Sequence, residues 1–352
     1  MNRRKFIQQS ATGAAALSLS RSALSFFDHT RMGIVVHSYW HRWGSKVTSG
    51  PYAGFQNALE LIEHCHQIGA GGIQVGVGSW VEGYAKKVRE KREKLGLYFE
   101  ASIGLPQKTE DVTKFENEIK NAKEAGADII RSVTLGTRRY ETFKTMADFE
   151  LFKKNSLAAL QRAEPILKKY QVKLGIENHK DWRADEMVGL LKQISSEHVG
   201  VTIDFGNSIA LLEDPMEVVQ TLAPYVLSTH VKDMALAAYE DGFLLSEVPL
   251  GQGMLDLKKM VAICRQHNPK VTLTLEMITR DPLQIPCLRP DYWTTMGQVT
   301  GAALARTLGL VKNQKNTIPL PTVMQLGAEE RLAVEEKNIL ACLAFSREKL
   351  EK

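Results

Sequence analysis

The chain has 352 residues, 44% of them hydrophobic, which is enough for one large domain or two ordinary ones with a sizeable core. The formal charge is +5, but residues 1–25 hold four of the 45 basic residues and none of the 40 acidic ones, so the remainder is nearly neutral. That balance gives no electrostatic case for nucleic acid as a partner. No run of 18 apolar residues predicts a membrane span.

Residues 1–25 are predicted to be a targeting segment. The stretch Asn2-Arg3-Arg4-Lys5-Phe6-Ile7 resembles a twin-arginine export signature. It is followed by an Ala-rich run over 11–19 and by small residues at 23–25 that suit a signal peptidase. A basic, disordered tail is the alternative. The twin-arginine route carries folded proteins, so we expect a periplasmic protein whose metal, if it has one, is loaded before export.

From residue 30 onward, short apolar runs rich in β-branched residues alternate about eight times with longer amphipathic stretches. The predicted strands are 33–37, 72–75, 97–102, 129–133, 173–176, 199–203, 226–231 and 271–275. The predicted helices are 58–65, 81–95, 109–125, 149–170, 184–194, 215–225, 256–266 and 295–310.

Strands that alternate with helices indicate βαβ units and a parallel sheet. Eight such units in about 280 residues predict an α/β fold, a single-domain (β/α)8 TIM barrel over residues 32–311. No GxGxxG fingerprint follows any predicted strand, which argues against a dinucleotide-binding fold. Residues 318–352 are predicted to form a C-terminal helical extension that packs against the barrel or against a partner subunit in a homo-oligomer.

Four consecutive predicted strands each end in a possible metal ligand. These residues are Glu177, Asp204, His230 and Glu276, separated by 27, 26 and 46 residues. Active sites of such barrels lie at the carboxyl ends of the strands, so the four side chains are expected at the same edge. Burying three carboxylates together without a cation would be very costly. An ion-pair network with lysines is the alternative.

Three carboxylates and one imidazole form a hard, oxygen-rich ligand set. We therefore expect one divalent metal ion, with Mn2+ as the leading candidate and Mg2+, Co2+ or Zn2+ as alternatives.

The motifs around these residues resemble those of a known superfamily. IENH with Glu177, TIDFGN with Asp204, THVKD with His230 and TLEM with Glu276 are similar to the metal-ligand motifs of the xylose-isomerase-like barrels. The resemblance spans most of residues 32–311. It implies a metal that chelates a carbonyl oxygen and a neighbouring hydroxyl of a sugar or keto-sugar. Glu177 and Glu276 would then act as the catalytic base and acid of an isomerase or epimerase, through an enediolate.

Seven further residues near the strand ends are candidate substrate contacts: His37, Glu100, His179, Asn207, Lys232, Asp233 and Arg280. Each has a structural alternative, such as packing, a loop ion pair or, for Arg280, pairing with Asp281. Core packing is expected for Trp182, Trp293 and Trp40, with stacking on a sugar as the alternative.

Some positions depart from the relatives. Ketose 3-epimerases of the superfamily usually carry a histidine where this chain has Asn207 and an arginine where it has Leu236, which argues against a free-ketose epimerase. The family 2 AP endonucleases need several more histidines, and none follows predicted strand two. Export argues against a sugar phosphate. Two alternatives stay open: a lyase or hydratase that eliminates from 3-keto-glycosides, and a catalytically inactive sugar-binding barrel.

Overall fold

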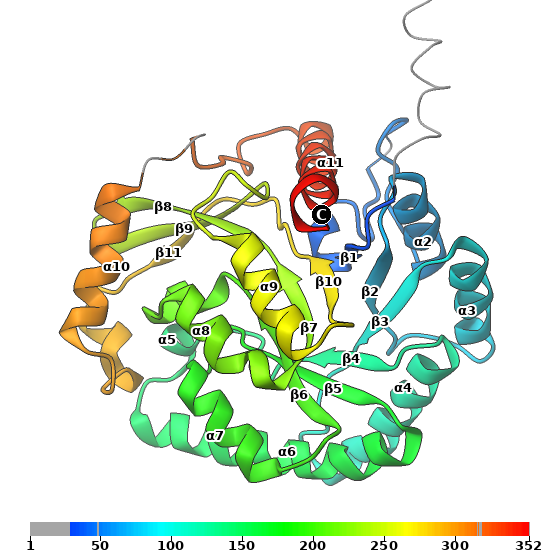
Figure 1. The fold of residues 1–352 in the computed structure, drawn as a ribbon, viewed down its shortest axis with the longest axis horizontal. Coiled ribbons are helices and arrows are strands. Elements are labelled where there is room, and N and C mark those ends of the chain that lie inside the picture. The colour runs from blue at the N-terminus through cyan, green and yellow to red at the C-terminus, as the bar shows by residue number, and fades with distance from the viewer. Residues whose placement is uncertain (1–28, 48, 315, 317–318, 352) are drawn as a thin grey trace, which may run out of the picture.

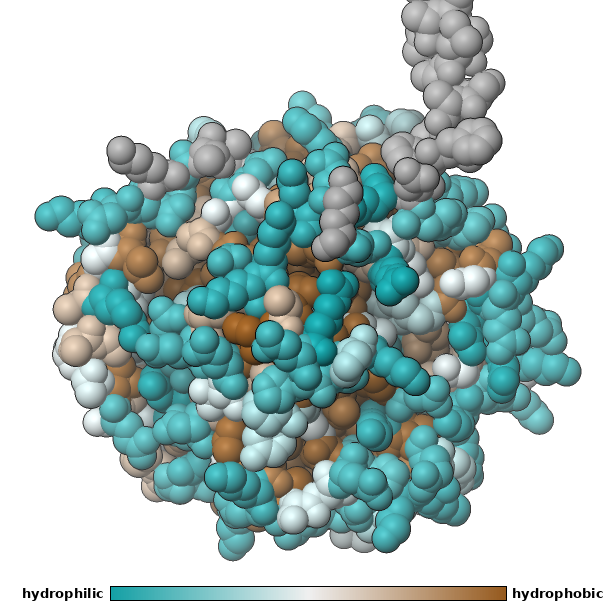
Figure 2. Space-filling model, in the orientation of Figure 1, coloured by the Kyte–Doolittle hydropathy of each residue, from teal (hydrophilic) through white to brown (hydrophobic). Residues whose placement is uncertain are grey.

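The structure is a computed structural model that describes residues 29–47, 49–314, 316 and 319–351. The predicted signal peptide over 1–25 lies outside the described residues, so export to the periplasm stays a prediction. None of the described helices is both long enough and apolar enough to cross a bilayer. On the face shown in Figure 2, hydrophilic side chains cover most of the surface and apolar ones lie between them.

Eight parallel strands form a closed barrel, which confirms the predicted fold (Figure 1). They are β1 (Gly33–Val35), β2 (Gly72–Gly76), β3 (Tyr98–Ser102), β4 (Ile129–Ser132), β5 (Lys173–Glu177), β6 (Val199–Asp204), β7 (Val226–Val231) and β10 (Thr272–Leu275). Every predicted strand is present, with ends that shift by at most two residues. Around the ring the order is β1-β10-β7-β6-β5-β4-β3-β2, so the four strands that end in predicted ligands are neighbours.

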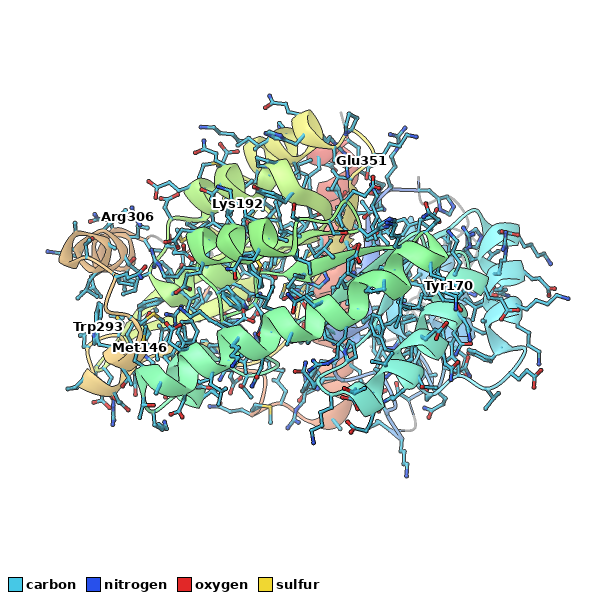
Figure 3. The ribbon with its side chains drawn as sticks, turned by 90° about the horizontal axis from the view of Figure 1, so that it is seen from below. Met146, Tyr170, Lys192, Trp293, Arg306 and Glu351 are labelled. Atoms are coloured by element: carbon cyan, nitrogen blue, oxygen red, sulfur yellow. The ribbon has the colours of Figure 1, made fainter. Side chains whose placement is uncertain are left out.

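Helices surround the barrel as the alternating pattern predicts. They are α2 (Ala58–Gln67), α3 (Tyr84–Leu95), α4 (Val112–Glu124), α5 (Arg139–Thr142), α6 (Met146–Tyr170), α7 (Ala184–Ile194), α8 (Pro215–Leu222), α9 (Leu257–His267) and α10 (Gly301–Asn313). Asp214 caps α8 by accepting the backbone N–H groups of Met216 and Glu217, and Pro215 occupies the first turn. Figure 3 shows α6 running the length of one side, from Met146 to Tyr170.

The long connection between β7 and β10 carries an antiparallel hairpin, which a strand that follows β10 extends into a small three-stranded sheet. Its strands are β8 (Asp233–Tyr239), β9 (Gly242–Val248) and β11 (Leu283–Ile285), in the order β11-β9-β8. Phe243, Leu245 and Ile285 are buried in a second hydrophobic cluster, and α10 packs beside this sheet (Figure 1). The sheet therefore forms a rigid wall beside the carboxyl ends of β7 and β10.

The predicted C-terminal helical extension is present as α11 (Ala328–Phe345), which lies near β1 and β10 (Figure 1). Glu335 accepts hydrogen bonds from the backbone N–H groups of His41 and Arg42, just beyond the carboxyl end of β1. Glu336 forms ion pairs with Arg42 and His64. These buried contacts attach the extension to a segment that leads into the rim of the barrel.

Candidate functional site

The structure brings the four predicted ligands together at the carboxyl end of the barrel. Glu177 and Asp204 are the last residues of β5 and β6, His230 lies in β7, and Glu276 directly follows β10. The strand register pairs Asp204 with His230. One ligand atom from each residue lies within 4.8 Å of the others, and all four side chains are buried. The apolar runs place these residues at the strand ends, because a barrel aligns its strand ends in one ring.

The orientation of His230 is set by a chain of hydrogen bonds across the barrel. Its Nε2 lies 2.8 Å from Oε1 of Gln74, whose own Nε2 donates to Oε2 of Glu100 at 2.8 Å. Gln74 therefore presents an acceptor, so the proton of the neutral imidazole belongs on Nε2 of His230. Nδ1 is left facing two carboxylates, at 3.3 Å from Oε2 of Glu177 and 3.5 Å from Oε1 of Glu276.

Two cations enter the cluster and neutralise part of its charge. Arg131 donates from Nε to Oε2 of Glu177 at 2.6 Å. Lys232 bridges two acids, since its Nζ lies 2.7 Å from Oδ2 of Asp204 and also bonds Oε2 of Glu276. Burial opposes ionisation of Glu177, yet Arg131 and His230 hold the pKa of that carboxyl well below its usual range. Part of the expected ion-pair alternative is thus present beside the candidate metal ligands.

The two positive charges of Arg131 and Lys232 do not balance the three carboxylates of the cluster. Burial lowers the pKa of His230, but the charges of Glu276 and Glu177 outweigh burial and raise it to about 10. A proton on Nδ1 would thus stand in for a missing cation between the two carboxylates. Within the described part of the chain, buried Nδ1 of His230 has only its ion-pair contacts with Glu177 and Glu276, and buried Oδ2 of Asp204 has only its ion pair with Lys232. The residues therefore fit a divalent ion, whose identity the site leaves open.

Asn207 connects the cluster to its surroundings. Its Nδ2 donates to Oε1 of Glu177 at 3.1 Å, and its backbone N–H donates to Oδ1 of Asp204 at 2.8 Å. Its Oδ1 accepts a hydrogen bond from Lys180. The residue that replaces the histidine of related epimerases thus holds two candidate ligands in place.

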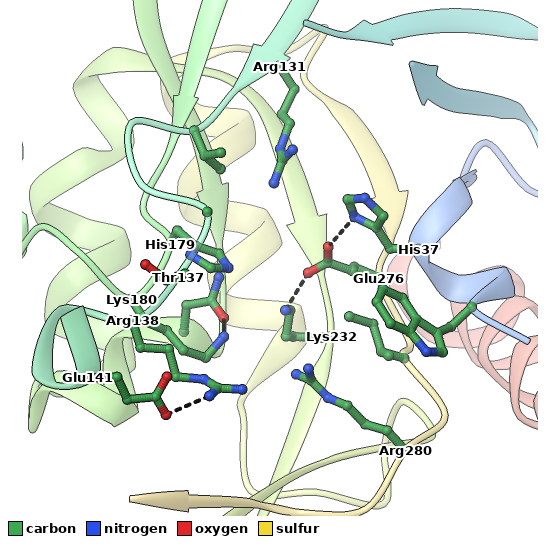
Figure 4. Close-up of a pocket in the computed structure, with 15 residues that line it drawn as sticks. His37, Arg131, Thr137, Arg138, Glu141, His179, Lys180, Lys232, Glu276 and Arg280 are labelled. Carbon is green, nitrogen blue, oxygen red and sulfur yellow. Dashed lines mark hydrogen bonds and ion pairs between the residues drawn. The ribbon is translucent and has the colours of Figure 1, made fainter. Parts of the chain in front are cut away.

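A cavity of about 510 Å³ opens beside the cluster (Figure 4). Its lining comprises His37, Trp40, Arg131, Val133, Gly136, Thr137, Arg138, Glu141, His179, Lys180, Asn207, Lys232, Glu276, Ile278 and Arg280. Five of these residues are lysine or arginine and two are glutamate. The cavity is therefore polar and rich in positive charge.

Five of the seven predicted substrate contacts line this cavity: His37, His179, Asn207, Lys232 and Arg280. The ring of His37 lies 3.3 Å from Oε1 of Glu276. Burial and the charge of Lys180 lower the pKa of His179 to about 3, so this imidazole is neutral at pH 7. Arg280 pairs with Glu247 of β9 rather than with the expected alternative Asp281. The sheet wall thus holds this guanidinium at the cavity.

The other two predicted substrate contacts are not on the cavity lining. Glu100 is buried beneath the cluster, where it binds Gln74 and Thr272. Asp233 accepts four backbone N–H groups at the base of the β8–β9 hairpin, from Met234, Gly251, Gly253 and Leu255. Both carboxylates are fixed by internal hydrogen bonds, so each has a structural role.

The tryptophans differ in their surroundings. Trp182 is buried against Phe152, as core packing predicts, and Trp293 packs on Tyr292. Trp40 is 63% exposed and lines the cavity, so the packing expected for it is wrong. The β1 segment ends in a 3-10 helix, η2 (Val36–Tyr39), that turns Trp40 outward to the rim.

Sequence reasoning missed several polar residues of the site, among them Gln74, Arg131, Arg138 and Lys180. Gln74 lies between Ile73 and Val75 in β2, and Arg131 follows two isoleucines in β4, so a long polar side chain in a short apolar run was the available signal. Lys180 comes three residues after Glu177, but its position does not reveal which atoms surround its ammonium group.

Residues 62–295 match the family described as "Xylose isomerase-like TIM barrel". The chain belongs to this family. A 3-oxo-isoapionate decarboxylase of Pectobacterium atrosepticum is 24% identical over 272 residues, which cover 75% of this chain and 92% of the relative.

Solved structures share the fold of this xylose isomerase-like barrel. A D-psicose 3-epimerase from Clostridium cellulolyticum H10, with D-tagatose, superimposes with a TM-score of 0.60 at 13% identity, covering 93% of this chain and all of the other. A xylose isomerase-like TIM barrel protein from Mycobacterium smegmatis in complex with magnesium gives a TM-score of 0.51 at 14% identity, covering 80% of this chain and all of the other. The family match and the decarboxylase relative support an enzyme.

Proposed function

We propose that this chain is a divalent-metal-dependent enzyme that forms an enediolate on a sugar or keto-sugar and so catalyses isomerisation or epimerisation. The observation that carries the proposal is the convergence of Glu177, Asp204, His230 and Glu276 beside a polar cavity. Glu177 and Glu276 both face Nδ1 of His230, from strands β5 and β10, which are three apart around the ring. A substrate held there would have a carboxylate on each side.

The metal would act as a Lewis acid that makes a C–H proton next to the substrate carbonyl easier to remove. The protein supplies two carboxylates that are ionised before substrate binds, because neighbouring cations hold the pKa values of Glu177 and Glu276 well below their usual range. One carboxylate takes the proton, and the other side of the site returns a proton to the opposite face or to the next carbon. Arg131 and Asn207 fix the position of Glu177 for this transfer.

Decarboxylation is a second candidate, distinct from the elimination from 3-keto-glycosides that the sequence left open. A β-keto acid that loses CO2 leaves its bonding electron pair on the same enolate, which then takes up a proton. The positively charged lining of the cavity favours an acidic substrate. The 3-oxo-isoapionate decarboxylase that this chain matches over 92% of that relative's length supports the same reaction type.

Turnover of metal-loaded protein in D2O, followed by NMR, tests the proposal. The substrates are keto-sugars, 3-keto-glycosides and 3-oxo sugar acids. An isomerase or epimerase incorporates deuterium next to the carbonyl and changes the stereochemistry or carbonyl position, whereas a decarboxylase releases CO2. Glu177→Gln should lower proton exchange at least about 100-fold, since general acid–base groups contribute about that much. Glu116→Gln, on the surface of α4, is the control.

Unchanged turnover in Glu177→Gln would contradict the assigned role of this carboxylate. Binding of these compounds without proton exchange or CO2 release would favour the inactive sugar-binding barrel instead.

A further inference from the structure

Lys180 is an unusual member of the cavity lining because no acid pairs with it. It is 4% exposed, and the hydrogen-bond acceptor of its Nζ is the amide oxygen of Asn207. Within the described residues, no carboxylate lies within ion-pair distance of Lys180. The other four lysines and arginines of the lining each have an acid partner: Arg131 with Glu177, Arg138 with Glu141, Lys232 with Asp204 and Glu276, and Arg280 with Glu247.

An ammonium group buried with only a neutral partner is costly to a folded protein. Burial and the charges of Lys232 and Arg280 lower the pKa of Lys180 to about 8. A divalent ion at the neighbouring cluster would add further positive charge. The more distant charges of Glu247 and Asp204 offset only part of this cost, since the pKa stays lowered, which points to an anion that arrives with the ligand.

We propose that Lys180 binds a carboxylate group of the substrate, so that the enzyme acts on a sugar acid and not on a neutral sugar. This inference rests on the proposed function, because it names the substrate class of the same cavity. A singly charged carboxylate matches one unpaired ammonium group better than a phosphate does, since a phosphate brings about two charges at pH 7.

Asn207 determines where this carboxylate lies relative to the reacting atoms. Its amide oxygen accepts from Lys180, while its amide nitrogen donates to Glu177, one of the candidate ligands. The ammonium and the metal cluster are thus separated by a single amide group. A carboxylate on Lys180 therefore belongs to a carbon close to the carbonyl, as in a keto acid. Figure 4 shows Lys180 on the same side of the cavity as His179 and Arg138, opposite His37 and Arg280.

Binding of a matched pair of probes to the full chain tests the inference. D-Gluconate and D-glucitol differ only in the carboxylate, and calorimetry would compare their Kd values with Mn2+ and again with EDTA. D-Glucitol 1-phosphate, which carries its phosphate on the carbon that is the carboxyl carbon of gluconate, tests a phosphate in the same way. The wild type should bind gluconate at least about 10-fold more tightly than glucitol, as a charge-assisted hydrogen bond predicts. Lys180→Met should reduce this ratio to within about twofold and leave the Kd of glucitol nearly unchanged.

The control variant is Lys169→Met, which removes a surface ammonium group that pairs with Glu116 and does not line the cavity. It should keep the acid preference. Thermal unfolding is a second measurement, since Lys180→Met removes an uncompensated buried charge and should keep or raise Tm.

Four results would overturn the inference: equal binding of gluconate and glucitol, an acid preference that survives in Lys180→Met, a fall in Tm for that variant, or Lys180-dependent binding of the phosphate that exceeds that of gluconate. If Lys180→Met still prefers gluconate over glucitol and this preference disappears in EDTA, the carboxylate binds the metal and not Lys180. The EDTA measurements also separate the failure of this inference from the failure of the proposed function. A chain that does not hold Mn2+ contradicts the proposed function, and the preference for gluconate that depends on Lys180 is then still measured in EDTA.

Discussion

Gln74 of β2 and His230 of β7 meet inside the barrel, where Oε1 of the amide lies 2.8 Å from Nε2 of the imidazole. Glu100 fixes the amide from the other side by accepting its N–H group. The pair directs Nδ1 of His230 toward Glu177 and Glu276. Hydrogen-bond partners of this kind orient histidine ligands and raise their basicity.

Gln74→Leu should weaken metal binding by about 10- to 100-fold, because Nε2 of His230 would lose its acceptor and the ring its orientation. Calorimetric titration with Mn2+ measures this change. The double variant Gln74→Glu, Glu100→Gln keeps an acceptor for His230 and exchanges the amide and the acid of this hydrogen bond, so it is the matched variant, with the smaller expected loss. Equal Mn2+ affinity in Gln74→Leu and the wild type would show that Gln74 does not position His230.

Asp233→Ala should destabilise the fold without a specific effect on substrate contacts. The carboxylate accepts four backbone N–H groups that hold the base of the hairpin, and removing it leaves them unsatisfied. We expect a loss of about 2–4 kcal/mol in the free energy of unfolding, measured with urea. Asp233→Asn keeps one acceptor and should lose less. A change below about 0.5 kcal/mol, typical of a surface position, would refute this role.

The stability of the α11 attachment should depend on pH through Glu335. Burial raises the pKa of this carboxyl to about 8, against the hydrogen bonds from His41 and Arg42. In the unfolded chain the pKa of this carboxyl is about 4.3, so the folded state holds the proton more tightly. The protonated carboxyl therefore contributes its full stability below about pH 4.3, and this contribution is lost as the pH rises through about 8.

Glu335→Gln removes this titration. The Tm of the variant minus the Tm of the wild type should therefore rise between pH 5 and pH 9, on the order of a few degrees. Parallel Tm curves of the two proteins across this range would contradict the assignment.

The affinity for gluconate should fall as the pH rises above about 8, because Lys180 then loses its proton and its charge. Lys180→Arg should bind gluconate with little pH dependence up to pH 10, since a guanidinium stays protonated. Calorimetry between pH 7 and pH 10 would show the difference. A wild-type affinity that is constant over this range would contradict a role for the Lys180 ammonium.

The barrel and the ligand quartet could be predicted from the sequence because both depend on local patterns. Short apolar runs mark the strands, and a polar residue directly after a run, such as Asp204, falls at the strand end. The β8–β9 hairpin was missed, although Asp241-Gly242 between two short apolar runs is a turn signal that could have located it.

The role of a residue that depends on distant partners could not be predicted in this way. Glu100 and Asp233 read as candidate substrate contacts because each lies at or near a strand end, but hydrogen bonds from other segments fix both internally. Lys180 is the converse case, because the sequence did not predict it as a site residue and the structure places it on the cavity lining. Its significance is that no carboxylate of the described fold lies within ion-pair distance of its ammonium group, and a sequence does not show which groups are absent from a side chain's surroundings.

Metal content of the purified chain tests the central claim most directly. Elemental analysis would compare the wild type with the double variant Asp204→Ala, His230→Ala after incubation with Mn2+ and removal of the free ion. We predict about one divalent ion per wild-type chain, in keeping with a single four-ligand site, and none in the double variant. A wild type that holds no metal, or a double variant that holds as much as the wild type, would contradict a metal centre at Glu177, Asp204, His230 and Glu276.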